Sequence, residues 1–115
     1  MSSKTVNNIS VNPIKDNFFL QTDQGVTISF SNREKFNIDP KLRVEKYNSN
    51  TKKWVPVKGL IDDESGLIAG GNEKTTYYFK YWFSGIGTYR IYFEFWNSST
   101  RKKASSLTTS TFFIK

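Results

Sequence analysis

The chain has 115 residues and a net charge of +7, and it contains no Cys and no His. Disulfide bonds, thiolate and imidazole metal ligands, Cys nucleophiles and a Ser–His–Asp triad are therefore excluded. No arrangement of Asp, Glu, Ser and Lys is distinctive of a hydrolase, so we expect no enzyme activity, no metal site and no cofactor. The length suits one domain with its own core, and no segment approaches the roughly 20 apolar residues of a membrane span.

The polar residues 1–7 predict a flexible N-terminal arm, and residues 8–115 predict a single folded domain without repeats or linkers. Alternation of apolar and polar residues is typical of strands. It predicts strands around residues 9–11, 26–30, 42–45, 54–57, 77–83, 89–96 and 107–113. Residues 32–40, with mixed charges and an Asp-Pro ending, predict a loop, because the residue before a proline disfavours a helix.

The stretch from residue 74 to residue 96 is the richest in aromatic side chains, and a Ser-Gly-Ile-Gly turn divides it into two alternating runs. Successive side chains of a strand point to opposite faces of the sheet. The first run therefore predicts one face with Tyr77, Phe79, Tyr81 and Phe83, and the other with Tyr78, Lys80 and Trp82. The second predicts Tyr89, Ile91, Phe93 and Phe95 on one face, and Arg90, Tyr92, Glu94 and Trp96 on the other. The final strand predicts Leu107, Thr109, Thr111 and Phe113 on a shared face.

No segment shows the apolar period of a helix, and turn signals recur every 8–12 residues. Seven to eight strands in this arrangement are typical of an all-β protein that folds as an antiparallel β-sandwich. We expect the two aromatic strands to supply most of its core.

Gly87-Thr88-Tyr89-Arg90-Ile91 resembles the start of strand F in immunoglobulin-like domains, where a Tyr after a Gly turn forms a tyrosine corner. Trp54, which follows a charged hairpin, fits the same layout. The chain as a whole is similar to bacterial immunoglobulin-like domains. This resemblance implies an immunoglobulin-like sandwich over residues 8–115, structural roles for Tyr89 and Trp54, and a non-catalytic function in adhesion, spacing or binding through end loops.

Two families of proteinase inhibitors on this fold also look similar. The bacterial intracellular proteinase inhibitors share the size, the lack of disulfides and the Gly-x-Tyr strand. In the chagasin-like inhibitors, three loops at one end block a protease cleft; Ala69-Gly70-Gly71 resembles their middle loop, and Trp96 falls where their last loop carries an aromatic residue. Asn32 to Phe36 and Glu94-Phe95 depart from the sequences of their first and last loops.

In the immunoglobulin-like strand order, the loops at residues 32–41, 66–73 and 97–105 meet at one end, and such loops commonly carry recognition residues. The predicted binding residues are Arg33, Lys35, Phe36, Gly70, Gly71, Asn72, Trp96, Arg101, Lys102 and Lys103. We expect a protein partner on this basic surface. The alternative is that these cations only keep the domain soluble. Nucleic acid is not expected, because Lys52 and Lys53 should lie at the other end and the charge is split.

A second alternative is carbohydrate binding through an outward aromatic patch of Tyr78, Trp82, Tyr92 and Trp96. The two strands that carry these rings belong to different sheets in an immunoglobulin-like order, so we do not expect a single platform. A neighbouring domain or a dimer partner could also cover the rings. The sequence leaves open the oligomeric state, the partner and the compartment, which is either the cytoplasm or an exported or surface setting.

Overall fold

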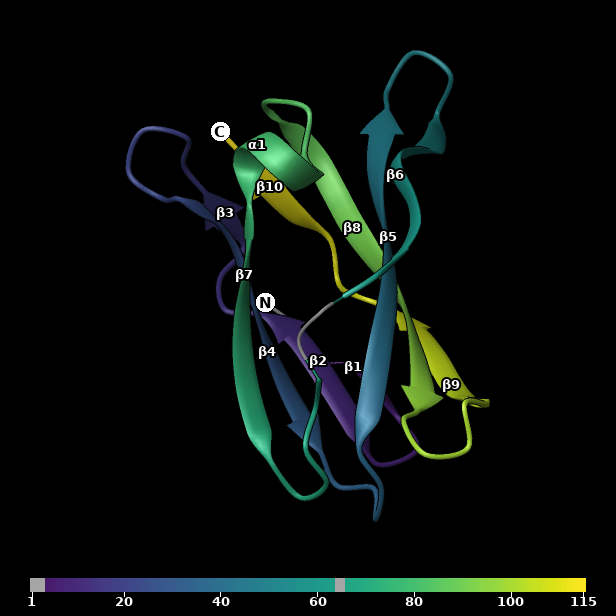
Figure 1. The fold of residues 1–115 in the computed structure, drawn as a ribbon. Coiled ribbons are helices and arrows are strands. Elements are labelled where there is room, and N and C mark those ends of the chain that lie inside the picture. Colours follow the sequence, from purple (N-terminus) through teal and green to yellow (C-terminus); the bar gives the residue numbers. More distant parts are fainter. Residues whose placement is uncertain (1–3, 64–65) are drawn as a thin grey trace.

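The computed structural model describes residues 4–63 and 66–115, and Figure 1 shows two β-sheets packed face to face. The described residues form ten strands and one short helix. They are β1 (Lys4–Val6), β2 (Ile9–Pro13), β3 (Asn17–Phe18), β4 (Gly25–Asn32), β5 (Ile38–Asn48), β6 (Lys53–Asp62), β7 (Asn72–Tyr78), α1 (Phe79–Trp82), β8 (Gly87–Asn97), β9 (Lys103–Thr108) and β10 (Phe112–Ile114). The prediction of an all-β sandwich is confirmed.

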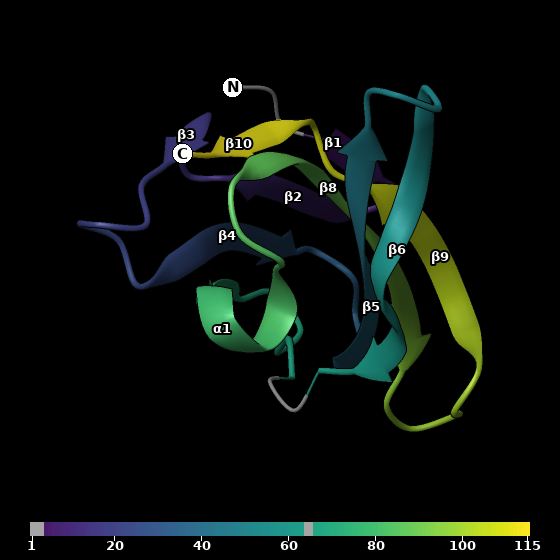
Figure 2. The same cartoon turned by 90° about the horizontal axis from the view of Figure 1, so that it is seen from above.

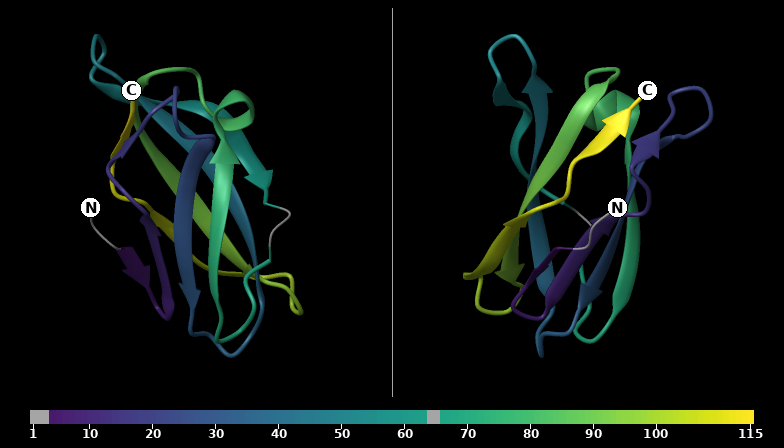
Figure 3. Two further views of the ribbon diagram at one scale, coloured as in Figure 1. Left: turned by 90° about the vertical axis from the view of Figure 1, so that its left-hand side faces the viewer. Right: turned by 180° about the vertical axis from the view of Figure 1, so that it is seen from behind.

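The first sheet has the order β1-β2-β4-β7, and all of its pairs are antiparallel. The second sheet has the order β3-β10-β8-β5-β6, and β9 also pairs with β8. One edge of β8 is thus covered by two successive strands, β10 near its start and β9 near its end. The two-residue β3 crosses to the second sheet and pairs in parallel with β10 (Figure 3).

Part of the predicted N-terminal arm is a strand. Lys4–Val6 forms β1, which pairs with β2 so that Lys4 lies opposite Val11. Asn7 has a positive φ of 51° in the intervening turn, a conformation that Asn tolerates better than most residues. The folded sheet therefore begins before residue 8, and residues 1–3 of the predicted arm lie outside the described part of the chain.

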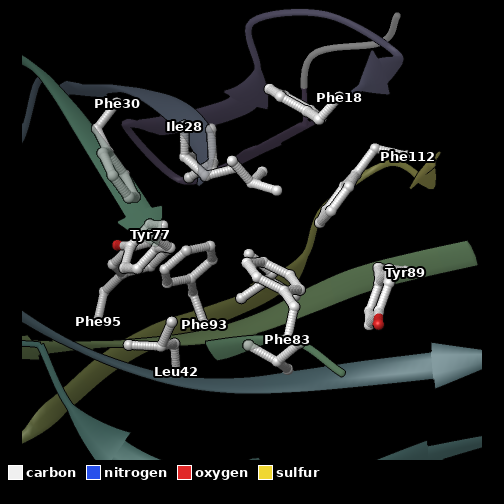
Figure 4. Packing of buried hydrophobic residues seen from close by; sticks show 14 of the residues in the cluster. Phe18, Ile28, Phe30, Leu42, Tyr77, Phe83, Tyr89, Phe93, Phe95 and Phe112 are labelled. Carbon is white, nitrogen blue, oxygen red and sulfur yellow. The ribbon is translucent and has the colours of Figure 1, made fainter. Parts of the chain in front are cut away.

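β8 runs through the centre of the molecule, and its predicted faces are confirmed. Tyr89, Ile91, Phe93 and Phe95 are fully buried between the sheets, whereas the alternate residues lie on the outer face and are partly exposed. Figure 4 shows the core that these rings form with side chains from the opposite sheet. Phe93, for example, meets Phe30 of β4 edge to face, with ring centroids 5.3 Å apart, a favoured arrangement of aromatic pairs.

The prediction of a strand over residues 77–83 is wrong after Tyr78. Gly25, the first residue of β4, pairs with Tyr78, so β7 has no partner strand beyond this point. A side chain at Gly25 would collide with the backbone of Tyr77, which explains the glycine at this close approach. The chain instead makes the single helical turn α1, and the ring of Phe79 meets that of Phe83, the residue after the turn, with centroids 6.4 Å apart. Trp82, predicted to point outward, packs against the core.

The predicted face of the last strand is wrong at its end. Thr109 is buried as expected, but Phe112 is fully buried and Phe113 is 39% exposed. Between β9 and β10 the Thr109 hydroxyl accepts a hydrogen bond from the Ile91 N–H at 3.0 Å, in place of a backbone partner. This interruption of the backbone hydrogen-bond ladder shifts the alternation of buried and exposed residues by one position. Residues of β10 that were expected to face outward therefore face inward, and the reverse.

Candidate functional site

Three loops meet at the lower end of the molecule in Figure 1, and we call residues 33–37, 66–71 and 98–102 together the three-loop end. The loops are joined by hydrogen bonds. The Ser98 N–H donates to the Asn37 carbonyl at 3.0 Å, and the Ala69 N–H donates to Asn37 Oδ1 at 2.9 Å. Leu67 forms an isolated bridge with Ile38 and is buried. Asn37 thus connects the first loop to both of the others.

Asn32, at the end of β4, is the internal support of this end, and we did not predict it. Its side chain is 1% exposed. Its Nδ2 donates to the carbonyls of Phe36 and Leu67 at 3.2 and 3.1 Å, and its Oδ1 accepts from the Glu34 N–H at 3.0 Å. A buried amide with these partners fixes the loops, because leaving any of these groups unpaired is costly. An Asn that ends an alternating apolar run is the available sequence signal.

Several predicted binding residues hold the loops instead of projecting from them. Arg33 donates from Nη1 to the Gly70 carbonyl at 2.9 Å and from Nη2 to Asn72 Oδ1 at 3.2 Å. Gly70 has a φ of +73°, which suits glycine. The Gly71 carbonyl accepts from the Asn32 N–H, and Phe36 packs against the core. The structure therefore brings these five predicted residues together as a scaffold.

The remaining predicted cations differ in exposure and pairing. Lys35, Arg101 and Lys102 are exposed on the loops. Lys103 belongs to β9, and its Nζ lies 3.9 Å from Glu94. Acidic side chains stand among these cations at the same end, namely Glu34, Asp39, Asp62, Asp63 and Glu73. The sequence pattern predicts a basic surface at this end. The structure instead shows acidic and basic side chains mixed there.

A cleft of about 410 Å³ opens beside Trp96, where the outer face of the second sheet reaches the three-loop end. Its lining is Asp39, Lys41, Asp62, Asp63, Trp96, Asn97 and Arg101. The Lys41 Nζ lies 4.5 Å from the centroid of the Trp96 ring and 3.7 Å from Asp62. The Asp63 carboxylate accepts a hydrogen bond from the buried Tyr77 hydroxyl at 2.6 Å. Burial and then the Asp63 charge raise the pKa of Tyr77 well above its usual value, so this hydroxyl stays a donor.

Glu94 orients the aromatic side of the cleft. It accepts hydrogen bonds from the Trp96 indole N–H at 3.1 Å and from the Tyr92 hydroxyl at 2.9 Å. Burial acts to raise the pKa of Glu94, but the hydrogen bonds from Tyr92 and Trp96 and the charges of Lys103 and Lys41 together lower it. The carboxylate thus remains ionised and fixes the Trp96 ring.

The outer face of the second sheet carries further ring and cation pairs. The Arg43 guanidinium lies 4.5 Å from the Tyr92 centroid, and that of Arg90 lies 4.2 Å from the Trp54 centroid. Glu45 accepts from both arginines, at 3.0 and 2.7 Å. Each of these rings therefore has a face covered by a cation of the protein itself.

The four rings of the predicted aromatic patch are not brought together. Tyr92 and Trp96 lie on β8 in the second sheet, whereas Tyr78 and Trp82 lie where β7 and α1 meet. Trp82 packs edge to face on Tyr77, with centroids 5.5 Å apart. A flat platform for sugar stacking would need coplanar, open rings, and this arrangement does not supply one.

Tyr89 and Trp54 occupy structural positions. The Tyr89 ring is fully buried and its hydroxyl donates to the Gly85 carbonyl at 2.8 Å, while the Ser84 N–H donates to that hydroxyl at 3.1 Å. Trp54 is partly buried on β6 and meets Tyr47 of β5 edge to face, with centroids 5.3 Å apart.

The chain matches no protein-family profile, and no curated protein or solved structure matches it. Within the described residues, no group of three or more acidic side chains is placed to hold a metal ion. The described part of the chain also has no helix of the length and apolarity that crossing a membrane requires. The functional argument therefore rests on the geometry of this chain.

Proposed function

We propose that the chain is a non-catalytic, immunoglobulin-like module that binds a protein partner through the three-loop end. The strand order supports the fold assignment. β2, β4 and β7 in one sheet, and β9 or β10 with β8, β5 and β6 in the other, follow the division of strands in variable-type immunoglobulin domains. The Tyr89 hydrogen bond to backbone four residues upstream supports it further.

The observation that carries the proposed function is the network of side-chain hydrogen bonds at the three-loop end. Its loops are tied together by Asn32, Arg33 and Asn37 before any partner arrives. A pre-ordered surface loses less conformational entropy on binding, so more of its contact energy appears as affinity. Arg101 and Trp96, beside the cleft, are residue types enriched at the energetic centres of protein interfaces. The mixed charges around them can fix the orientation of a partner.

Charge reversal at the loop tips tests this proposal. We expect Arg101→Glu with Lys102→Glu to abolish capture of the specific partner from a membrane-depleted lysate. Lys103 is left intact because of its proximity to Glu94. The matched control is Lys52→Glu with Lys53→Glu in the β5–β6 hairpin at the other end. Equal loss with both pairs, or capture that the loop-tip reversal leaves unchanged, would refute the proposed site.

A proteinase inhibitor remains the second candidate, favoured by the placement of the glycine-containing loop. Residues 69–71 are joined through Asn37 and Asn32 to the first loop, which also contacts the third loop, so the glycine-containing loop lies at the same end as both of the others. An inhibition assay against cysteine and serine proteases distinguishes the two candidates. Inhibition that Arg101→Glu relieves would favour an inhibitor, and its absence would favour recognition of another class of protein.

A further inference from the structure

The end of the molecule opposite the three-loop end faces the viewer in Figure 2, and we call it the apolar end because it exposes a group of large apolar side chains. Its exposed side chains are Phe19, Leu20, Tyr78, Tyr81, Ile86 and Phe113, between 39% and 63% exposed. They come from four segments: the β3–β4 loop, the region of α1, the turn before β8, and β10. Phe19, Leu20 and Ile86 line a shared depression of about 640 Å³. Scattered exposed apolar residues are ordinary, but the meeting of Phe19 and Leu20 with Ile86 from a separate segment indicates a contact surface.

The cations of the apolar end accompany its rings. Lys115 Nζ lies 5.8 Å from the Phe113 centroid, Lys80 Nζ lies 5.2 Å from that of Tyr81, and Lys15 Nζ lies 5.9 Å from that of Phe19. Further lysines at this end are Lys46, Lys52 and Lys53. Three of the exposed rings are thus flanked by an ammonium group on a flexible stem, which can move away from the ring.

The carboxylates of the apolar end are few. Asp23 binds Lys15 at 2.8 Å and accepts from the Phe19 N–H at 2.7 Å, so its charge is offset and it holds the loop that carries Phe19 and Leu20. The other is Asp16, in the turn before β3. Cations therefore outnumber carboxylates at this end, whereas both signs mix at the three-loop end.

The type of basic residue at the apolar end distinguishes between a protein partner and a lipid bilayer as its binding partner. The cations that flank the exposed apolar rings of this end are lysines. Arg33 and Arg101 lie at the three-loop end, and Arg43 and Arg90 lie on the outer face of the second sheet, where both bind Glu45. Protein interfaces are enriched in Arg and depleted in Lys. A symmetric contact between two copies would also oppose like charges. Apolar and aromatic side chains flanked by lysines are instead the combination found at the boundary of headgroups and acyl chains.

We propose that the apolar end docks on a bilayer that carries anionic lipids. Ile86, Leu20 and Phe19 insert at the level of the headgroups and the first acyl carbons, and the flanking lysines bind lipid phosphates and carboxylates. The molecule measures 41 Å along its longest axis, and the two ends lie at opposite ends of the sandwich (Figure 3). A docked molecule therefore turns its three-loop end away from the membrane. Docking needs no assumption about what the three-loop end binds.

Two exposed isoleucines make a matched pair for the test. Ile86 at the apolar end is 63% exposed and Ile68 at the three-loop end is 62% exposed. Because the chain has no cysteine, Ile86→Cys and Ile68→Cys each give a single site for a polarity-sensitive dye. We expect phosphatidylcholine vesicles that contain phosphatidylserine to shift the emission of the dye at position 86 to the blue, and not that at position 68. A shift at both positions, or at neither, would overturn the proposal.

Vesicle sedimentation measures separately what the apolar side chains and the lysines contribute to vesicle binding. Ile86→Ser should weaken binding about ten-fold, as expected for loss of one buried isoleucine, and Ile68→Ser should leave it unchanged. Lys80→Gln with Lys115→Gln should weaken binding by about ten-fold or more, whereas Lys35→Gln with Lys102→Gln should have little effect although it removes the same charge. Equal binding to vesicles of phosphatidylcholine alone, or insensitivity to added NaCl, would overturn the electrostatic part.

A sedimentation-velocity run on the lipid-free protein tests whether a second copy of the chain covers the apolar end. We expect a monomer for the wild type and for Ile86→Ser. A wild-type dimer that Ile86→Ser dissociates would show that a second copy covers the apolar end, and would overturn membrane docking.

Discussion

The three-loop end and the apolar end are built from different kinds of contact. At the three-loop end, side-chain amides and a guanidinium bind backbone carbonyls across loops, and the exposed tips are mostly polar, with Ile68 as an apolar exception. At the apolar end, rings pack on rings inside the sandwich, as with Phe83 and Tyr89 at 5.0 Å, and further apolar side chains continue onto the surface. The first end is ordered by directional bonds and the second by burial.

This difference affects how each end can be changed. Directional bonds hold a loop in one position, so a substitution that removes one of them alters the shape of the surface. An apolar core tolerates changes to the exposed side chains above it, because these contribute little to burial. Recognition of one partner suits the three-loop end, and contact with a fluid, uniform surface such as a bilayer suits the apolar end.

The largest effect is expected from adjacent residues of β10. Phe112→Ala should lower the free energy of unfolding by about 4 kcal/mol, because a fully buried ring in contact with Phe18, Phe83 and Tyr89 is replaced by a cavity. Phe113→Ala should change it by about 0.5 kcal/mol or less, as expected for an exposed position. Urea unfolding followed by tryptophan fluorescence measures both. Equal costs would mean that the inward and outward faces of β10 are not distinct.

At the three-loop end the corresponding pair is Asn32 and Asn37. Asn32→Ala should cost about 3 kcal/mol, because it leaves the buried carbonyl of Leu67 without its side-chain donor. Asn37→Ala, at an exposed position where the side chain makes one bond to the Ala69 N–H, should cost about 1 kcal/mol. Urea unfolding gives both values, and amide hydrogen exchange of residues 66–71 should accelerate more in Asn32→Ala. A larger loss in Asn37→Ala would place the support of the loops elsewhere.

The parts of the fold that could be predicted are those where the local pattern and the sheet agree. β8 has partners along both edges, so its alternation carries through to the core without interruption. The run after Tyr78 has the same aromatic alternation, yet it becomes α1, because its partner β4 begins only at Gly25. Where a neighbouring strand ends depends on the tertiary structure, and the local alternation of residues does not show it. The same holds for Thr109, whose side chain replaces a ladder bond and reverses the face of β10.

The meeting of the three loops followed from the expected strand order, but the roles of their residues did not. Arg33 is of a residue type common in binding sites, but here it holds two segments together. It donates to the backbone carbonyl of Gly70 and to the amide oxygen of Asn72, which lie 37 and 39 positions away in the sequence. The sequence pattern does not single out Asn32, because an Asn at a strand end is common. The sequence pattern does not indicate the apolar end, because its six side chains are scattered along the chain and only the fold gathers them.

The smallest predicted effect concerns the Tyr89 hydroxyl, which orders the turn before Ile86 at the apolar end. Tyr89→Phe should cost about 1–2 kcal/mol, because the Gly85 carbonyl and the Ser84 N–H both lose the hydroxyl as a partner. Tyr92→Phe is the control: its hydroxyl bonds only to the Glu94 carboxylate on the outer face, and about 0.5 kcal/mol is expected. Thermal unfolding monitored by circular dichroism measures both. Because residues 84 and 85 directly precede Ile86, Tyr89→Phe should also weaken vesicle binding, whereas Tyr92→Phe should not. If Tyr89→Phe lowers stability without weakening vesicle binding, docking does not depend on the order of this turn.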